Sequence, residues 1–375
     1  MERWDLIIVG GGPAGLSTAL HLCRLDPAWA ARILILEKAR YPRHKLCGGG
    51  ITEYGLRCLS GLGLDIAEVP RVPIDELRMV RGRHRASFHS GHGLTIFRRD
   101  AFDAWLAQKV LAAGVRLSQG ETVSRLETTK GGVQVTTDRG SYLARALVAA
   151  DGSNGICRRQ LGAADLGRVG RAIELLTPVR GPLDEALFSK RVAVFDFSPA
   201  PADLQGYYWD FPCWVDGRPH INRGVYDART APERPRADLK AILAGCLAER
   251  EIDIASCELM GHPIRWFEPT LALSQPHVLY AGDSAGADPL LGEGIAFALG
   301  YGGVAADTLA AAFRARDFRF EDYSARLRAS EYGQILEDRV RQAKQLYRHR
   351  HPLLLPTFMP NSFVQRRSGT SDRGA

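Results

Sequence analysis

Short apolar runs and one helical pattern alternate over the first part of the chain. Positions 5–9 ("DLIIV") and 32–36 ("RILIL") are apolar runs of β type, and positions 13–24 between them carry apolar residues at helical spacing. A glycine-rich stretch, "GGGPAG", separates the first run from the helical pattern. A strand, a turn, a helix and a second strand in this order predict a parallel βαβ unit.

The middle of the chain divides into segments of different pattern. Pro42 and three consecutive glycines break both periods over 41–52, which predicts a loop, whereas 101–113 has helical spacing. Three β-type stretches between 115 and 152 predict strands of an additional sheet beside the βαβ unit. From about 167 to 260 the chain is rich in aromatic residues, prolines and β-type runs, which predict a separate lobe.

A last β-type run, "HVLYAGD", and a glycine-rich turn lead into a long helical pattern that starts near residue 293. We therefore predict an α/β protein, with a Rossmann-like nucleotide-binding domain, an inserted α+β substrate lobe dominated by an antiparallel sheet, and a C-terminal helical region. The predicted parts are 1–166 and 266–310 for the nucleotide-binding domain, 167–265 for the substrate lobe, and 311–375 for the C-terminal helical region and tail.

The composition is that of a large globular protein, with 45% hydrophobic and 24% charged residues among 375. No long uninterrupted apolar run occurs, and the first β-type run lies where the apolar part of a signal peptide would be. We therefore expect a cytoplasmic protein that does not span a membrane. The seven cysteines form no CxxC pair and no regular spacing, which argues against a metal site and a disulfide framework.

The net charge of +7 is compatible with an anionic membrane surface, an acidic substrate or nucleic acid as partner. We expect no nucleic-acid partner, because the chain has no recognisable nucleic-acid-binding module and no interleaving of basic and aromatic residues. The interpretation that we favour is that the charge serves solubility and contacts with phosphates.

One C-terminal segment leaves a peripheral membrane contact open. Between 334 and 347, apolar residues share one helical face, basic residues surround it, and "HPLLLPTFMP" follows. The apolar residues are Ile335, Leu336, Val340, Ala343 and Tyr347, and the basic ones are Arg339, Arg341 and Lys344. The interpretation that we favour is a core helix with a solvated basic face.

The glycine-rich turn has the spacing of a dinucleotide-binding motif. Gly10, Gly12 and Gly15 form G-x-G-x-x-G directly after a strand and before a helix, and Glu37 ends the next strand. The first glycine permits the tight turn, the second lets a pyrophosphate approach, and the third lets the helix pack on the strand. The helix N-terminus supplies amides to the phosphates, and Glu37 can accept hydrogen bonds from ribose hydroxyls, which disfavours NADP.

A second segment, "LYAGDSAGADPLLGEGIAFAL", favours FAD over NAD. Asp283 follows a strand and Gly282, as expected for an acceptor of ribityl hydroxyls. Gly292, Gly294 and Ile295 precede an apolar helical pattern, so their amides can face the pyrimidine edge of a flavin and stabilise its anionic reduced form.

These segments together resemble the FAD-dependent oxidoreductases of the aromatic hydroxylase superfamily. The resemblance rests on "GGGPAG", "RRDAFDAWL", "ADGSNG" and "AGDSAGADPLLGEGI", and it covers about residues 1–300. It implies that Arg99 contacts the cofactor and that Asp151 helps to organise the nucleotide region, with Arg98 as an adjacent candidate. The predicted FAD-binding residues are Gly10, Gly12, Pro13, Ala14, Gly15, Glu37, Lys38, Lys45, Cys47, Gly48, Arg99, Asp151, Gly282, Asp283, Gly292, Gly294 and Ile295.

Two further segments resemble the geranylgeranyl reductase family. "KLCGGG" at 45–50 is similar to its flavin-side loop, and "YYWDFP" at 207–212 is similar to its Y-x-W-x-F-P motif. That motif implies a substrate-binding role for Tyr207, Trp209, Phe211 and Pro212, and strand alternation places its three aromatic residues on one face, where they can line an apolar cavity or form an ordinary core stripe.

The chain departs from that family at two points and lacks the motif of another. Leu204 stands where a proline or arginine is common, and "NRGVY" at 222–226 stands where a glycine-x-glycine is usual. Both differences concern the identity of the substrate more than the resemblance to the geranylgeranyl reductase family. The W-x-W-x-I-P motif of the flavin-dependent halogenases is absent.

Cys47 is the candidate for a direct chemical role. It lies between Lys45 and a glycine triplet, and the resemblance places this loop beside the flavin ring. A nearby ammonium group and free amides are expected to lower the pKa of its thiol. Cys47 can donate a proton, position the substrate or fill space.

The expected activity is the saturation of carbon–carbon double bonds in an isoprenoid chain, by hydride transfer from reduced FAD. The alternative is an FAD-dependent monooxygenase that hydroxylates or epoxidises an apolar substrate. A non-catalytic electron-transfer protein is disfavoured, because no iron–sulfur cysteine pattern exists. No second strand-linked GxGxxG is found, so the reductant is either transiently bound NAD(P)H or an electron-donor protein.

Overall fold

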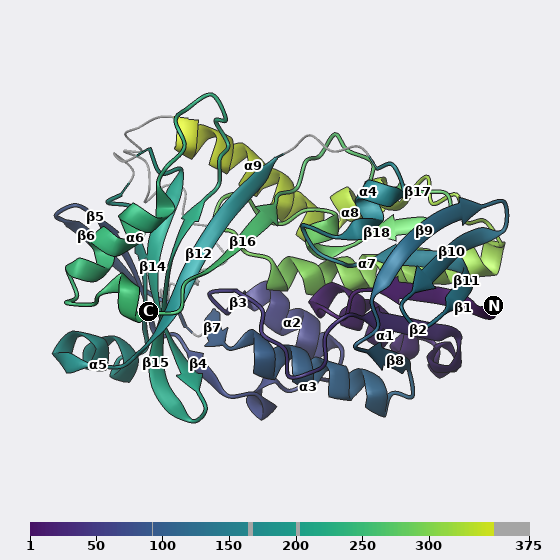
Figure 1. Ribbon diagram of the computed structural model, residues 1–375, viewed down its shortest axis with the longest axis horizontal. Helices are drawn as coiled ribbons and strands as arrows, with labels where there is room; N and C mark the ends of the chain where they lie inside the picture. The colour runs from purple at the N-terminus through teal and green to yellow at the C-terminus, as the bar shows by residue number, and fades with distance from the viewer. Residues whose placement is uncertain (92, 164–167, 200–202, 349–375) are drawn as a thin grey trace, which may run out of the picture.

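The computed structural model describes residues 1–91, 93–163, 168–199 and 203–348. The chain forms two lobes that lie side by side along the long axis (Figure 1). One lobe contains an eight-stranded sheet and the other a seven-stranded sheet, and three short strands between residues 50 and 97 form a third, separate sheet. The α/β architecture with a C-terminal helical region confirms the predicted fold class.

The first lobe is built on a sheet with the order β17-β18-β11-β1-β2-β8, which is parallel from β18 to β8 and antiparallel between β17 and β18. Its strands are β1 (Glu2–Val9), β2 (Ile33–Glu37), β8 (Arg116–Gln119), β11 (Ser141–Ala149), β17 (Ser274–Gln275) and β18 (Val278–Tyr280). β1 pairs in parallel with both β2 and β11, and β18 pairs in parallel with β11. The strand that returns late in the sequence therefore lies only two strands away from the first one.

The strands between 115 and 152 do not all form an additional sheet. β8 and β11 join the main sheet as parallel strands, and only β9 (Val123–Thr129) and β10 (Gly132–Thr137) extend from β11 as an antiparallel meander. Hydrophobic runs with both faces covered belong in a central parallel sheet, and residues 146–149 of β11 are completely buried.

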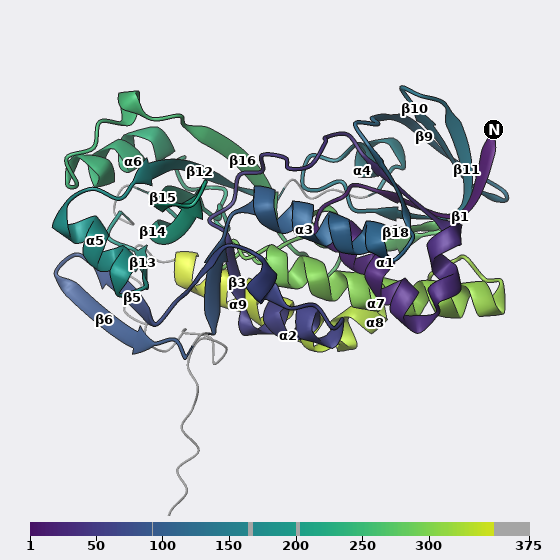
Figure 2. The ribbon, with the colours of Figure 1, turned by 90° about the horizontal axis from the view of Figure 1, so that it is seen from below.

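Three helices pack together beside the parallel strands: α1 (Pro13–Leu25), α3 (Arg99–Ala112) and α7 (Ile295–Ala315), as Figure 2 shows. α2 (Glu53–Gly61) also packs against α7. α7 is long and apolar enough to cross a membrane, but 78% of its apolar window is buried inside the protein. It acts here as a core helix.

The second lobe is a mostly antiparallel sheet with the order β16-β12-β15-β14-β13-β5-β6. Its strands are β5 (Glu76–Arg81), β6 (His84–His89), β12 (Val169–Pro178), β13 (Val192–Asp196), β14 (Gly206–Val215), β15 (Arg218–Asp227) and β16 (Met260–Arg265). β5 pairs in parallel with β13, so an early hairpin joins strands from the 167–265 segment. The boundaries predicted from the sequence assign that hairpin to the nucleotide-binding domain.

Residues 41–52 contain less loop than the sequence predicts. Gly50–Thr52 form a short strand, β3, which pairs with β7 (Leu94–Phe97), and β7 also pairs with β4 (Arg71–Pro73). Gly49 has a φ of +79°, and a Cβ there would overlap the carbonyl oxygen of Phe97. The glycine therefore lets the loop close against β7 before the strand begins.

The C-terminal segment forms α8 (Tyr323–Ala329) and α9 (Glu331–Arg348). The apolar face of α9 packs inward, since Leu336, Val340, Ala343 and Tyr347 are all buried. Arg339 was expected on a solvated basic face, but it is only 1% exposed. Two buried carboxylates explain its position, since Arg339 lies 3.3 Å from Asp288 and 3.9 Å from Glu293. The segment "HPLLLPTFMP" lies outside the described residues.

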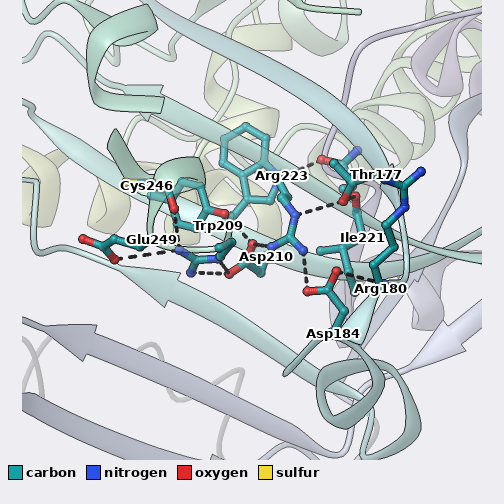
Figure 3. Close-up of polar contacts among 12 residues, drawn as sticks. Thr177, Arg180, Asp184, Trp209, Asp210, Ile221, Arg223, Cys246 and Glu249 are labelled. Atoms are coloured by element: carbon teal, nitrogen blue, oxygen red, sulfur yellow. Dashed lines mark hydrogen bonds and ion pairs between the residues drawn. The ribbon is translucent and has the colours of Figure 1, made fainter. Parts of the chain in front are cut away.

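A buried ion network attaches two helices to the outer face of the second sheet (Figure 3). Arg223 of β15 is completely buried, and its guanidinium binds Asp210 and, at 2.5 Å, Asp184. Arg250 binds the other oxygen of Asp210 at 2.6 Å. Asp184 belongs to α5 (Gly181–Ser189), and Arg250 follows α6 (Leu239–Ala248), so the network joins α5 and α6 through the sheet.

Candidate functional site

A cavity of about 600 Å³ lies where the two lobes meet. It is bordered by the carboxyl ends of β1, β2 and β11, which is where open α/β sheets bind ligands, and by the inner face of the second sheet. The predicted site residues that line it are Gly10, Gly12, Pro13, Ala14, Glu37, Lys38, Lys45, Cys47, Gly48, Arg99, Asp151, Tyr207, Trp209, Phe211, Gly282, Asp283, Gly292, Gly294 and Ile295. Gly15 and Pro212 are the predicted site residues that are not among the lining residues.

The glycine turn after β1 is shaped by backbone contacts. Gly10 has a φ of +105°, and a Cβ there would overlap Ala150 of the neighbouring strand end, with the carbonyl carbon at 2.7 Å. A Cβ at Gly15 would overlap the carbonyl oxygen of Gly10 and lie 3.0 Å from Ile8. Gly15 therefore lets α1 pack on β1.

Glu37 braces the glycine turn from the end of β2. It accepts hydrogen bonds from the backbone amides of Gly11 at 2.8 Å and Ala39 at 2.9 Å. An ionised carboxylate offers about four acceptor sites, so capacity remains for hydroxyl groups of a ligand.

The arginine predicted beside the cofactor is already paired. Arg99 binds both oxygens of Asp103 at 2.8 Å, and Arg43 reaches Asp103 at 3.0 Å. Asp103 raises the pKa of the Arg99 guanidinium above its ordinary value against the effect of burial. Arg98 pairs with Asp100 at 3.1 Å on the outer side.

The Cys47 peptide is held from both sides by the second sheet. Its N–H donates to Glu174 Oε1 at 2.9 Å, and its carbonyl oxygen accepts from Asn222 Nδ2 at 3.2 Å. Asn222 Oδ1 in turn accepts from the Trp209 indole at 2.8 Å. The flavin-side loop and the aromatic motif, distant in sequence, are thus connected by one chain of hydrogen bonds.

The pKa of the Cys47 thiol is raised, contrary to the lowered value expected from the sequence. Burial is the largest cause, and the Glu174 carboxylate adds to it, whereas Arg99 and the Gly49 amide oppose it. Cys47 therefore carries its proton at neutral pH. All seven cysteines are free thiols.

Lys45 meets a histidine that the sequence did not single out. Its Nζ lies 2.5 Å from His262 Nε2 on β16. Burial, with Arg99 as a smaller contribution, lowers the pKa of Lys45 to about 8, and burial together with Lys45 lowers the pKa of His262 to about 4. A protonated Lys45 therefore donates to a neutral His262 at pH 7.

An aromatic wall lines the cavity on the side of the second sheet. It consists of Phe195, Tyr207, Trp209, Phe211 and Tyr226. Their neighbouring ring centroids are 5.0–6.2 Å apart, which is ordinary packing for aromatic side chains.

Pro212, predicted to bind the substrate, is not among the residues that line the cavity. It alternates with Phe211 on β14 and therefore points to the opposite face of the sheet. The sequence missed Phe195 and Tyr226 because each stands on another strand, outside the motif.

The returning segment places Asp283 and the start of α7 at the cavity. Ser153 Oγ lies 3.5 Å from Asp283 Oδ2, and a Cβ on Gly294 would lie 3.2 Å from Asp283 Oδ1. Glu293 also lines the cavity, where Thr52 donates to it at 2.5 Å. Burial raises the pKa of Glu293 to about 7.

Glu174 gives the site a pH-dependent contribution to stability. It is completely buried, and burial raises its pKa from 4.5 to about 7, although the Cys47 amide and Arg98 oppose the shift. Between these pH values the unfolded chain has released this proton and the folded protein keeps it. The contribution of Glu174 to the free energy of unfolding therefore falls as pH rises from 4.5 to 7.

Glu174→Gln is expected to remove that pH dependence. From pH 5 to pH 8, the free energy of unfolding should fall by about 1–3 kcal/mol less in the variant than in the unsubstituted protein. Denaturant unfolding at the two pH values measures this difference. Glu185→Gln, at an exposed position of α5, is the control. Parallel losses for Glu174→Gln and the unsubstituted protein would contradict the assignment.

The arrangement fits a dinucleotide with a flavin. The turn after β1 offers the first amides of α1, which have no partners within the helix, to phosphates. A carboxylate stands at the end of β2 and another at the returning turn, and further amides begin α7. The volume lies within the range of about 300–1,000 Å³ that is typical of ligand sites.

Comparison with known proteins agrees with this geometry. Residues 3–177 match the FAD binding domain family. Menaquinone reductase from Mycolicibacterium smegmatis is 25% identical, over 82% of this chain and 76% of that protein. Digeranylgeranylglycerophospholipid reductase 1 from Methanothermobacter thermautotrophicus is 25% identical, over 90% of this chain and 83% of that protein.

A monooxygenase is similar as well. The 12-dehydrotetracycline 5-monooxygenase/anhydrotetracycline 6-monooxygenase of Streptomyces rimosus is 27% identical, over 75% of this chain and 57% of that protein. Among solved structures, a geranylgeranyl bacteriochlorophyll reductase-like protein from Thermoplasma acidophilum has a TM-score of 0.74 at 20% identity, covering 93% of this chain and 87% of its own. That likeness establishes the fold.

Proposed function

We propose that this chain, an FAD-dependent oxidoreductase, saturates carbon–carbon double bonds of an isoprenoid chain. The observation that carries the proposal is that every polar side-chain group of the aromatic wall is hydrogen-bonded within the protein. The Trp209 indole donates to Asn222, and the hydroxyls of Tyr207 and Tyr226 donate to backbone carbonyls. A wall whose polar groups are already bonded selects an apolar ligand.

Several residues would hold the cofactor. The amides in the first turn of α1 that follow Pro13, which have no partners within the helix, would bind the pyrophosphate, and Glu37 would accept from the ribose hydroxyls. Asp283 would accept from the ribityl chain, and the amides that begin α7 would face the pyrimidine edge of the ring. When bound and reduced, FAD supplies a hydride. The electrons that reduce it come from NAD(P)H or from an electron-donor protein.

The chain's own residues would orient and protonate the alkene. The aromatic wall holds the isoprenoid segment and excludes water, and its π faces stabilise the positive charge that develops on carbon. Cys47 holds a proton at Sγ at neutral pH, and its peptide is fixed between Glu174 and Asn222. We assign it the proton that is added to the second alkene carbon, after which water reprotonates the thiolate.

A single-turnover experiment tests the reaction type. The protein is reduced with dithionite without oxygen and then mixed with a geranylgeranyl substrate. We expect the flavin absorbance to return as the alkene is reduced, because the alkene accepts the hydride. Return of the absorbance only after oxygen is admitted, with an oxygenated product, would instead establish the monooxygenase reaction.

Phe211→Ala tests the aromatic wall. The substitution removes buried contact area worth roughly 1–3 kcal/mol, so we expect the KM for the isoprenoid to rise about tenfold or more, with FAD content nearly unchanged. Phe188→Ala is the control, since Phe188 packs edge-on against Trp214, away from the cavity. FAD content, melting temperature and turnover are measured on the same samples. Loss of stability and FAD together, with normal turnover per bound FAD, would assign Phe211 to the core.

A further inference from the structure

Three tyrosine hydroxyls bind three consecutive backbone carbonyls just before the start of α7. Tyr226 donates to Pro289 at 3.0 Å, Tyr347 to Leu290 at 2.7 Å, and Tyr207 to Leu291 at 2.5 Å. We call the three side chains the tyrosine clamp and residues 289–291 the carbonyl segment.

The tyrosine clamp comes from three different elements. Tyr207 belongs to β14, Tyr226 to β15 and Tyr347 to the last turn of α9, and all three belong to one buried cluster of the second lobe. Figure 1 shows α9 reaching from the first lobe to the second sheet. The carbonyl segment is therefore held by the substrate lobe and the C-terminal helix at once.

Asp288 and its ion pair with Arg339 also hold the carbonyl segment. Asp288 accepts hydrogen bonds from the amides of Leu290 at 2.6 Å and Leu291 at 3.2 Å. Arg339 of α9 lies 3.3 Å from Asp288 and 3.9 Å from Glu293. α9 thus supplies both a hydroxyl donor and a counter-charge to the residues around the carbonyl segment.

The hydroxyls remain donors at every ordinary pH. Burial is the largest cause that raises the pKa of each clamp tyrosine above its ordinary value, and the Asp288 carboxylate adds to it. A buried hydroxyl has few other acceptors within reach, so each clamp tyrosine donates to its one backbone carbonyl. The consequence is a backbone segment with little freedom to move.

We infer that the tyrosine clamp consists of positioning residues for the flavin. By holding the carbonyl segment, it fixes the amides of residues 293–295, which line the cavity. The Gly292 amide, expected from the sequence to face the flavin, instead donates to the Asp288 carbonyl at 3.1 Å. Fixed amides stabilise negative charge better than mobile ones, because no reorganisation is needed when the charge develops. The substrate lobe and α9 therefore help to set the reduction potential of FAD. The inference rests on FAD in the cavity and holds for reduction or oxygenation of the substrate.

Tyr347→Phe is the decisive variant, because Tyr347 is not among the residues that line the cavity. We expect its FAD to have a two-electron midpoint potential about 30 mV lower, which corresponds to a tenfold greater loss of affinity for reduced than for oxidised FAD. Hydrogen exchange of the amides of residues 290–295 in the FAD-free protein should be faster, on the same samples. Neither measurement requires a substrate, so neither depends on the proposed reaction.

Tyr323→Phe is the matched control, since it removes a buried hydroxyl that donates to the Tyr280 carbonyl at 3.0 Å on another element. The inference requires that the control keep the potential and the exchange rates of the unsubstituted protein. Equal potentials in the two variants, or unchanged exchange at 290–295 in Tyr347→Phe, would overturn it. If FAD is lost from Tyr347→Phe, the exchange measurement alone decides between these outcomes.

Discussion

Replacing Gly10 with alanine is expected to abolish FAD retention. The φ of +105° is unfavourable for any residue with a Cβ, and the added atom would collide with the Ala150 carbonyl at the end of the adjacent strand. The backbone at the collision is part of the central sheet, so the turn has to move instead. Movement of the turn displaces the first amides of α1. We expect FAD affinity to fall at least about a hundredfold, given roughly 1–3 kcal/mol of backbone strain and the lost phosphate contacts.

The measurement is the FAD dissociation constant, with the melting temperature recorded on the same samples. Gly61→Ala is the control, because Gly61 lies in α2 and a Cβ there would have no neighbour within 4 Å. That substitution should keep FAD binding unchanged. FAD affinity of the Gly10→Ala variant within about threefold of the unsubstituted protein would mean that the turn does not bind the cofactor.

Arg223→Met is expected to cause the largest loss of stability. Removal of the guanidinium leaves Asp184 without its charged partner, while Asp210 keeps Arg250 and the Tyr208 hydroxyl (Figure 3). Breaking a buried ion pair by removing one partner costs about 3–5 kcal/mol, because the remaining charge stays buried. Since α5 and α6 are both attached through this network, we expect the second lobe to unfold first.

Denaturant unfolding measures this loss. Arg125→Met provides the control, because Arg125 pairs with Glu127 at an exposed position and its substitution should leave the unfolding curve nearly unchanged. Similar curves for the two variants would show that the network does not stabilise the second lobe.

The sequence predicted the nucleotide-binding part of the molecule well, because its signals are local. A strand, a glycine turn and a helix are adjacent in sequence, and each residue of G-x-G-x-x-G has a role that follows from its spacing. Gly15 illustrates this, since it packs α1 on β1 as its position in the motif requires. The returning segment with Asp283 was found in the same way, from a strand followed by a glycine-rich turn.

The sequence could not predict contacts between distant segments. Glu174 and His262 are single polar residues on strands, with no motif around them, and they reach the site only because β12 and β16 pair in the second sheet. Burial by these strands also explains why the pKa of Cys47 rises, although its sequence neighbours suggested the opposite. The hairpin of β5 and β6 joined the second sheet for a similar reason, since strand pairing over long separations leaves no local pattern.

The side chains of the family motif alternate between the two faces of β14. Tyr207, Trp209 and Phe211 face the cavity, whereas Pro212 of the same motif faces away. The period of two residues predicts this difference, so strand geometry was a better guide to the lining of the cavity than membership of the motif.

Mass spectrometry of the product tests the central claim most directly. The protein is supplied with FAD, dithionite as reductant and a geranylgeranyl compound without oxygen, and the lipid is then analysed for its change in mass. Saturation adds two hydrogen atoms to each double bond, so we expect a gain of about two mass units per bond reduced. An unchanged lipid without oxygen, together with a gain of about sixteen units when oxygen and reductant are both present, would contradict the reductase assignment and identify an oxygenase.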